Sequence, residues 1–147
     1  MKRLTVSNVA DKDLLSSTNK LLSHVGITAK QIISINELTR VASSMFVAVF
    51  EALFRTRVEG VVRRPKGTRD YISNCQVILD SLSRQLQMDL RHITGESIFQ
   101  GDRRALSNLV NILLRIATIT GYVLSCAMQC SAVLRHYVSY DMQINYL

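Results

Sequence analysis

The sequence has little glycine and proline, with six glycines and one proline among 147 residues. Aromatic residues are also few, and no sustained stretch alternates apolar and polar residues between turns. Strands of a half-buried sheet need that alternation, whereas leucine, isoleucine and valine recur here every three or four residues. These absences argue against a sheet protein. The composition instead predicts an all-α fold, and the chain is long enough to bury a core in one domain.

The known motifs for nucleotide binding and hydrolysis are missing. The chain contains no GxxxxGK(S/T), GxGxxG, HExxH or GxSxG sequence. Its three histidines are not spaced to place a serine, a histidine and an acid together. We therefore expect a non-enzymatic protein with no catalytic residues, no cofactor and no small-molecule substrate.

Cysteine is scarce, and Cys75, Cys126 and Cys130 form no even disulfide framework. Cys126 and Cys130 lie one helical turn apart, but only His136 is close enough in sequence to add a ligand, so no metal site is expected. The pattern favours buried, reduced cysteines and a cytoplasmic location. The segment from Met1 to Val6 lacks a continuous apolar stretch, so we expect no signal peptide.

Acidic residues are too few to balance the basic ones. Eighteen lysines and arginines against eleven aspartates and glutamates give a net charge of +7. The densest positive cluster is the segment 55–69, called the basic loop below, which has no helical period and contains Pro65, Gly67 and a single acid, Glu59. A surface of this kind is suited to an anionic partner. The charge alone does not distinguish among nucleic acid, an acidic protein and an anionic membrane. The candidate binding residues are Arg55, Arg57, Arg63, Arg64, Lys66 and Arg69.

Apolar residues at helical spacing predict most of the architecture. Helices are expected at 11–25, from Ser43 to residue 54, at 68–90 and at 102–121, with Gly121 as a stop. The segment 27–38 is expected to be an extended or single-turn connector. The predicted helix 68–90 should be long and central, because six apolar positions form one face: Ile72, Cys75, Leu79, Leu82, Leu86 and Leu90.

The connector 91–102 between the last two of these helices is too apolar to be a free loop. We expect Ile93, Ile98 and Phe99 to be buried against the two helices that the connector joins. Gly95 and Gly101 are expected to supply unusual backbone dihedral angles there.

The C-terminal part permits two interpretations. Residues 116–134 carry no charge and are numerous enough to span a bilayer, which leaves a membrane anchor as one alternative. Gly121, Gln129 and several serines and threonines dilute this stretch, so we prefer an apolar helix at 122–140 that docks on a partner. The predicted division is a domain at 1–121 and a partner-docking helix and tail at 122–147. The packing candidates are Tyr122, Tyr137, Tyr140 and Tyr146.

Several segments together resemble the NN-type calponin-homology (NN-CH) domain of centrosomal and ciliary proteins. They are Met45–Phe54, Gln76–Leu82, Leu90–Ile98, Gly101–Asp102 and Leu106–Val110.

The resemblance covers roughly residues 13–119. It implies a compact calponin-homology fold and a non-enzymatic structural role in a larger cytoskeletal assembly: a centrosome, a basal body, or the axoneme of a cilium or flagellum. The partners that it implies are tubulin, microtubules or ciliary scaffold proteins. Because the surface of tubulin is acidic, the basic loop is the candidate docking face. The membrane anchor and a nucleic-acid-binding basic domain remain the alternatives, although the basic loop lacks the interleaved aromatic residues of an RNA-recognition module.

Overall fold

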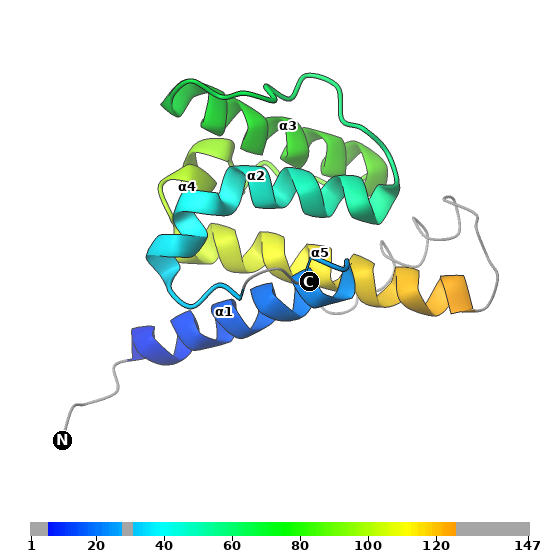
Figure 1. Cartoon of the computed structure of the whole chain (residues 1–147), viewed down its shortest axis with the longest axis horizontal. Helices are drawn as coiled ribbons and strands as arrows, with labels where there is room; N and C mark the ends of the chain where they lie inside the picture. The colour runs from blue at the N-terminus through cyan, green and yellow to red at the C-terminus, as the bar shows by residue number, and fades with distance from the viewer. Residues whose placement is uncertain (1–5, 28–30, 126–147) are drawn as a thin grey trace.

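The computed structural model describes residues 6–27 and 31–125. Helices joined by loops make up these ranges, with no strand among the described residues (Figure 1). The all-α prediction is therefore confirmed for this part of the chain. The five helices of the described ranges are α1 (Val6–His24), α2 (Ile35–Phe54), α3 (Thr68–Leu86), α4 (Gly95–Phe99) and α5 (Arg103–Ser125).

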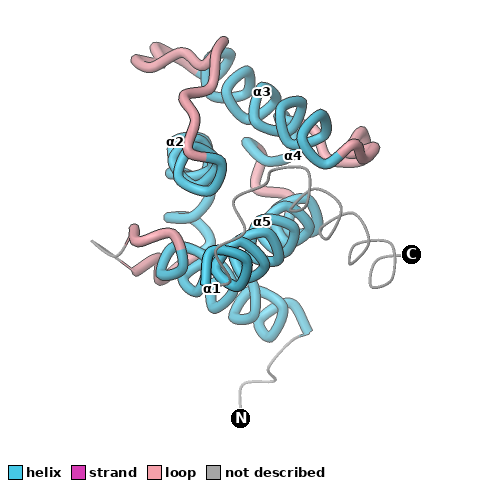
Figure 2. The backbone as a smooth tube through the Cα atoms, turned by 90° about the vertical axis from the view of Figure 1, so that its right-hand side faces the viewer, coloured by secondary structure: helices cyan, strands magenta, loops and turns pink. Residues whose placement is uncertain are grey.

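Helix α2 is the centre of the described fold, because it contacts each of the other four helices. Helices α1 and α5 pack together on one side of α2, and α3 lies on the other side with the short α4 beside it (Figures 1 and 2). The prediction that the helix starting at Thr68 is central was wrong. Helix α3 buries one face, whereas α2 buries ten of its twenty residues, as expected of a helix enclosed by neighbours.

The start of α2 was also predicted wrongly, because the helix begins at Ile35 and residues 35–38 are not a connector. The hydroxyl of Ser34 accepts a hydrogen bond from the backbone N–H of Glu37 at 3.2 Å, and Glu37 Oε2 accepts one from the N–H of Ile33 at 3.3 Å. This arrangement satisfies amides that would otherwise lack partners. Ser43, expected at the start of the helix, is buried within it.

Helix α1 begins before its predicted start, and α5 ends after its predicted end. Helix α1 begins at Val6, since neither glycine nor proline interrupts the residues before Asp11. Helix α5 passes through Gly121 and continues to Ser125, because a single glycine costs only about 1 kcal/mol in a helix and does not end it by itself. Asp11 and Arg103 join the two helices by an ion pair at 3.0 Å.

The connector between α3 and α5 contains α4 and is closely packed. Helix α3 ends at Leu86 rather than Leu90, with Gln87 in the left-handed region at φ 53°. Ile93 and Ile98 are buried as predicted, and Phe99 is half-buried. Gly101 has the predicted positive φ, 75°, but Gly95 does not. Gly95 is instead required by close packing, since a Cβ atom there would lie 2.5 Å from the carbonyl oxygen of Ile72.

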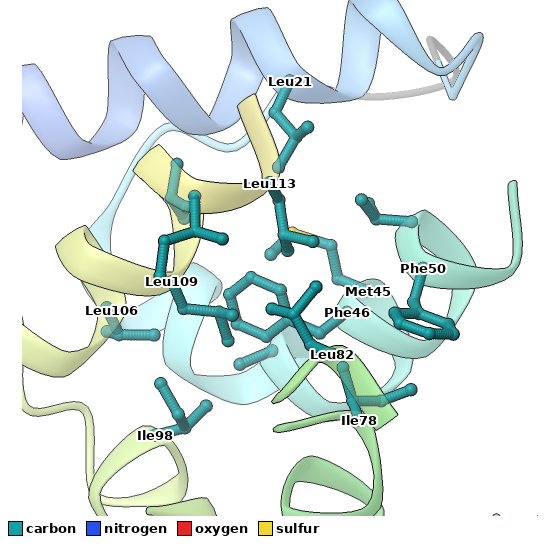
Figure 3. Close-up of a cluster of buried hydrophobic side chains, with 14 of the residues drawn as sticks. Leu21, Met45, Phe46, Phe50, Ile78, Leu82, Ile98, Leu106, Leu109 and Leu113 are labelled. Carbon is teal, nitrogen blue, oxygen red and sulfur yellow. The ribbon is translucent and has the colours of Figure 1, made fainter. Parts of the chain in front are cut away.

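The core lies where α2 faces α3, α4 and α5. Phe46 and Phe50 of α2 lie among leucine and isoleucine side chains of the other helices (Figure 3). Cys75 is also buried, as predicted, and burial raises the pKa of its thiol to about 11. This thiol is therefore a packing group at neutral pH. Cys126, Cys130 and His136 lie outside the described residues.

Candidate functional site

The basic loop runs from the end of α2 into the first turn of α3, which contains Arg69. All six of its candidate side chains are exposed. Helices α2 and α3 run in the same direction, so the loop returns along the length of α3 before that helix begins (Figure 1). The six charges are consequently spread along the molecule and do not form one compact cluster.

Residues 55–67 have no regular secondary structure, but side chains from both neighbouring helices fix them. The side-chain amide of Asn74 in α3 accepts from the N–H of Val62 at 2.7 Å and donates to its carbonyl at 2.9 Å. Glu51 in α2 accepts a hydrogen bond from the N–H of Val58 at 2.7 Å, and the Val58 side chain is buried. These hydrogen bonds fix the backbone that carries the basic side chains.

Arg63 differs from the other candidates because its charge is paired. Its guanidinium donates to both carboxylate oxygens of Glu51, at 2.7 and 2.8 Å, and to the carbonyl of Val58 at 3.1 Å. Hydrogen bonding by Arg63 is the largest cause of the lowered pKa of Glu51. Such a bidentate pair fixes the loop on α2, so Arg63 has a structural role in addition to its predicted one.

The other five basic residues form no ion pair with any residue that the structure describes. Arg57 lies at the C-terminal end of α3, where it lines an open hollow of about 400 Å³ with Arg84. Lys66 and Arg69 lie beside Thr68 at the opposite end of the helix. Thr68 and Arg84 are separated by about 24 Å along the helix axis, at about 1.5 Å per residue.

Two further exposed arginines lie near the two ends of α3 and add positive charge there. Sequence reasoning did not identify them. Arg84 adds to the Arg57 end, and Arg40 of α2 lines a second hollow, together with Gly67 and Thr68, at the start of α3. Each is a single charge on a helix surface and belongs to no cluster in the sequence. Only the packing of α2 beside α3 brings them next to the loop.

Within residues 6–27 and 31–125, no group of three or more histidine, cysteine or acidic side chains is placed to hold a metal ion. No helix in the same ranges is both long and apolar enough to cross a bilayer. Of the possible anchor at 116–134, the residues after Ser125 lie outside the described ranges.

The predicted partner-packing tyrosines also lie largely beyond this part of the structure. Tyr122 belongs to the last turn of α5, but its side chain is not described. Tyr137, Tyr140 and Tyr146 lie outside the described residues, so their role and the division at 121/122 stay predictions. Helix α5 itself runs across that division.

Two comparisons with known proteins found similarities over part of the chain. A family model described as a domain of unknown function (DUF5745) matches residues 58–116. The chain is 34% identical over 79 residues to "Centrosomal protein of 95 kDa" of Mus musculus and 33% identical over 79 residues to the protein of the same name from Rattus norvegicus. Each match covers 53% of this chain and 10% of the relative, so the chain spans about a tenth of the length of these curated relatives. No solved structure matches the chain.

The segment matched by the family model contains most of the basic loop. It includes Arg63, Arg64, Lys66 and Arg69, and continues through α3 and α4 into α5. Arg55 and Arg57 precede it. The end of the loop beside the start of α3 therefore lies within the matched segment.

Proposed function

We propose that this protein is a non-enzymatic, centrosome-associated component of the cytoskeleton that binds microtubules through the basic loop. The observation that carries the proposal is the set of exposed, unpaired basic side chains on a loop that hydrogen bonds hold in place. The similarity to "Centrosomal protein of 95 kDa" supports the location. The resemblance to NN-type calponin-homology domains supports tubulin, or a ciliary scaffold protein, as the partner.

The loop is suited electrostatically to a broad acidic surface. Because its two ends are about 24 Å apart along α3, they would contact different parts of a partner. Exposed charges arranged in this way increase the rate of encounter with an oppositely charged surface, and dissolved salt weakens the attraction. A loop held by Asn74 and Glu51 also loses little conformational freedom on binding.

Three finer parts of the proposal rest on the resemblance. They are a calponin-homology-like arrangement of the helices, a place in a basal body or in the axoneme of a cilium or flagellum, and membership of a larger assembly. The absence of the known catalytic motifs and the similarity to a centrosomal protein both support a structural role.

Co-sedimentation with stabilised microtubules across a salt series tests the proposal. Two charge reversals address the two parts of the loop separately: Arg57→Glu/Arg64→Glu and Lys66→Glu/Arg69→Glu. Each is expected to weaken binding roughly tenfold or more, because placing like charges opposite each other costs several kcal/mol. Arg63 is left intact, since its loss would also release Glu51 and disturb the fold.

The matched control is Lys12→Glu/Lys20→Glu, which makes the same change in net charge on α1. Both lysines are exposed, and α1 does not contact α3. The control should pellet like the unmodified protein. If it loses binding to the same extent, the attraction comes from net charge alone and the assignment to the loop is wrong. If the unmodified protein does not pellet at low salt, direct microtubule binding is rejected.

A further inference from the structure

The middle of the basic loop carries an apolar side chain that faces solvent. Val62 is 37% exposed, which places it among the few large apolar side chains exposed in the described ranges. The neighbouring valines of the loop point inward, because Val58 is buried and Val61 packs against the core. The two residues that follow Val62 are Arg63 and Arg64. An apolar group is therefore exposed among the basic side chains.

Asn74 of α3 holds both polar backbone groups of Val62. Its side-chain oxygen accepts a hydrogen bond from the N–H of Val62 at 2.7 Å, and its side-chain nitrogen donates to the carbonyl at 2.9 Å. Asn74 is only 4% exposed, and a buried amide needs a partner for its donor and another for its acceptor. Val62 supplies both partners. The backbone of Val62 is thus fixed on α3, and its side chain leaves from a defined point.

The residue after Val62 is fixed by the other neighbouring helix, α2. The guanidinium of Arg63 donates to both carboxylate oxygens of Glu51 and to the carbonyl of Val58. Val62 therefore lies between hydrogen bonds to α3 and a bidentate ion pair with α2. A side chain held in this way loses less conformational freedom on binding than one on a free loop.

The fold does not explain why position 62 is apolar. Asn74 bonds only backbone atoms there, and every residue except proline supplies the same N–H and carbonyl groups. The exposed part of the Val62 side chain gains nothing from the core. Single exposed apolar residues are common on protein surfaces, but this one is held in place beside the exposed, unpaired charge of Arg64.

We propose that Val62 is a specificity-determining contact of the microtubule-binding surface and that Asn74 is the residue that positions it. This inference rests on the proposed function, since it concerns the same loop. The basic side chains attract the acidic surface, and Val62 packs against an apolar group of the microtubule where the two surfaces meet. Charge speeds the encounter with any acidic partner, whereas a fixed apolar contact requires a matching surface.

Co-sedimentation of Val62→Thr with stabilised microtubules tests the contact. Threonine has a similar branched shape and leaves the backbone bonds to Asn74 in place. Binding should weaken roughly two- to fivefold, because the fold already covers most of the side chain and 37% of it is left to bury. Salt screens charges but not an apolar contact. The ratio of the two affinities should therefore stay constant across the salt series.

The matched control is Ile33→Thr. Ile33 is 78% exposed and lies in the connector between α1 and α2, outside the basic loop. The change removes exposed apolar surface and leaves the net charge as it is, just as Val62→Thr does. This variant should pellet like the unmodified protein at every salt concentration.

A double-mutant cycle with Asn74→Ala tests the positioning role. Alanine removes both hydrogen bonds to Val62, changes no charge and is compatible with helix α3. Once Val62 is released, its replacement by threonine should have little further effect. The two changes together should therefore weaken binding by less than the product of their separate effects. A purely structural role of Asn74 would not produce this coupling. Circular dichroism shows that each variant is folded.

Three results would each overturn the inference. They are unchanged binding of Val62→Thr, an equal loss of binding by Ile33→Thr, and independent effects of Val62→Thr and Asn74→Ala. If Lys66→Glu/Arg69→Glu loses binding while Val62→Thr keeps it, the proposed function stands and only the role of Val62 is rejected. If the unmodified protein does not pellet at low salt, the microtubule proposal itself fails, and this inference fails with it.

Discussion

Replacing Gly95 by alanine should separate α4 from α3. A Cβ atom at this position would lie 2.5 Å from the carbonyl oxygen of Ile72 and 2.8 Å from the backbone nitrogen of Gln76. Both are backbone atoms of α3, which a rotamer change cannot move. The N–H of Gly95 also donates to the side-chain oxygen of Gln76 at 2.8 Å, so a displacement of α4 would strain this hydrogen bond as well.

The expected change in the free energy of unfolding of Gly95→Ala is the sum of two opposing effects. Overpacking of a tightly fitted interior destabilises proteins by about 1–3 kcal/mol. Alanine regains about 0.5–1 kcal/mol relative to glycine in a helix, but Gly95 is the first residue of a five-residue helix, where this gain is small. We therefore predict a net loss of about 1–3 kcal/mol in the free energy of unfolding. For a protein of this size, each kcal/mol lowers Tm by about 2–4 °C.

Urea unfolding monitored by circular dichroism measures this change, with Gly67→Ala as the matched control. Gly67 has φ −175°, which any residue adopts, and a Cβ atom there would meet nothing within 4 Å. The control should lose less than about 1 kcal/mol, because alanine is a poorer helix N-cap than glycine. If Gly95→Ala unfolds at the same urea concentration as Gly67→Ala, the close approach of α4 to α3 is not what requires glycine, and the reasoning fails.

Three further predictions concern the helix start, the core and the basic loop. Ser34→Ala should lose about 1 kcal/mol in urea unfolding because it removes the cap of α2, whereas Ser44→Ala on the exposed face of the same helix should lose nothing. Phe46→Ala should lose about 3–5 kcal/mol in the same assay, because Phe46 is fully buried. The pKa of Glu51 is lowered from its ordinary value of 4.5, so its ion pair with Arg63 stabilises the fold above that pH and is lost as the pH falls through the folded value. The stability difference between the unmodified protein and Glu51→Gln should therefore shrink on acidification, and a difference that is independent of pH would contradict the pairing.

Helix α3 and the connector after it could be predicted from the sequence because their determinants are local. Cys75, Leu79 and Leu82 repeat at helical spacing on one face, and all three are buried. The apolar residues Ile93 and Ile98 could not lie in a solvated loop, and both are buried. The start of α2 was also encoded locally, in Ser34 and Glu37. The prediction placed it at Ser43 instead, because it relied on the aromatic residues that follow Ser43.

The candidate site was less predictable because its geometry depends on contacts between residues far apart in the sequence. The sequence pattern placed six basic residues in one segment, but it did not show that Arg63 pairs with Glu51, twelve positions earlier. It also did not show that Arg40 and Arg84 lie beside the two ends of the loop. The parallel packing of α2 and α3 decides all of these contacts, and no local motif specifies that packing.

The same packing shows that the family-matched segment is not a complete folding unit. Residues 58–116 contain α3, α4 and much of α5, yet no Cα atom of α3 lies within 8 Å of one in α5. Helix α2 packs against both of them, and its Phe46 and Phe50 lie among Ile78, Leu82 and Leu109 (Figure 3). Without α2, the buried faces of both helices would be exposed to water, at a cost of about 25 cal/mol per Å² of apolar surface. The basic loop therefore depends on a helix that precedes the matched segment.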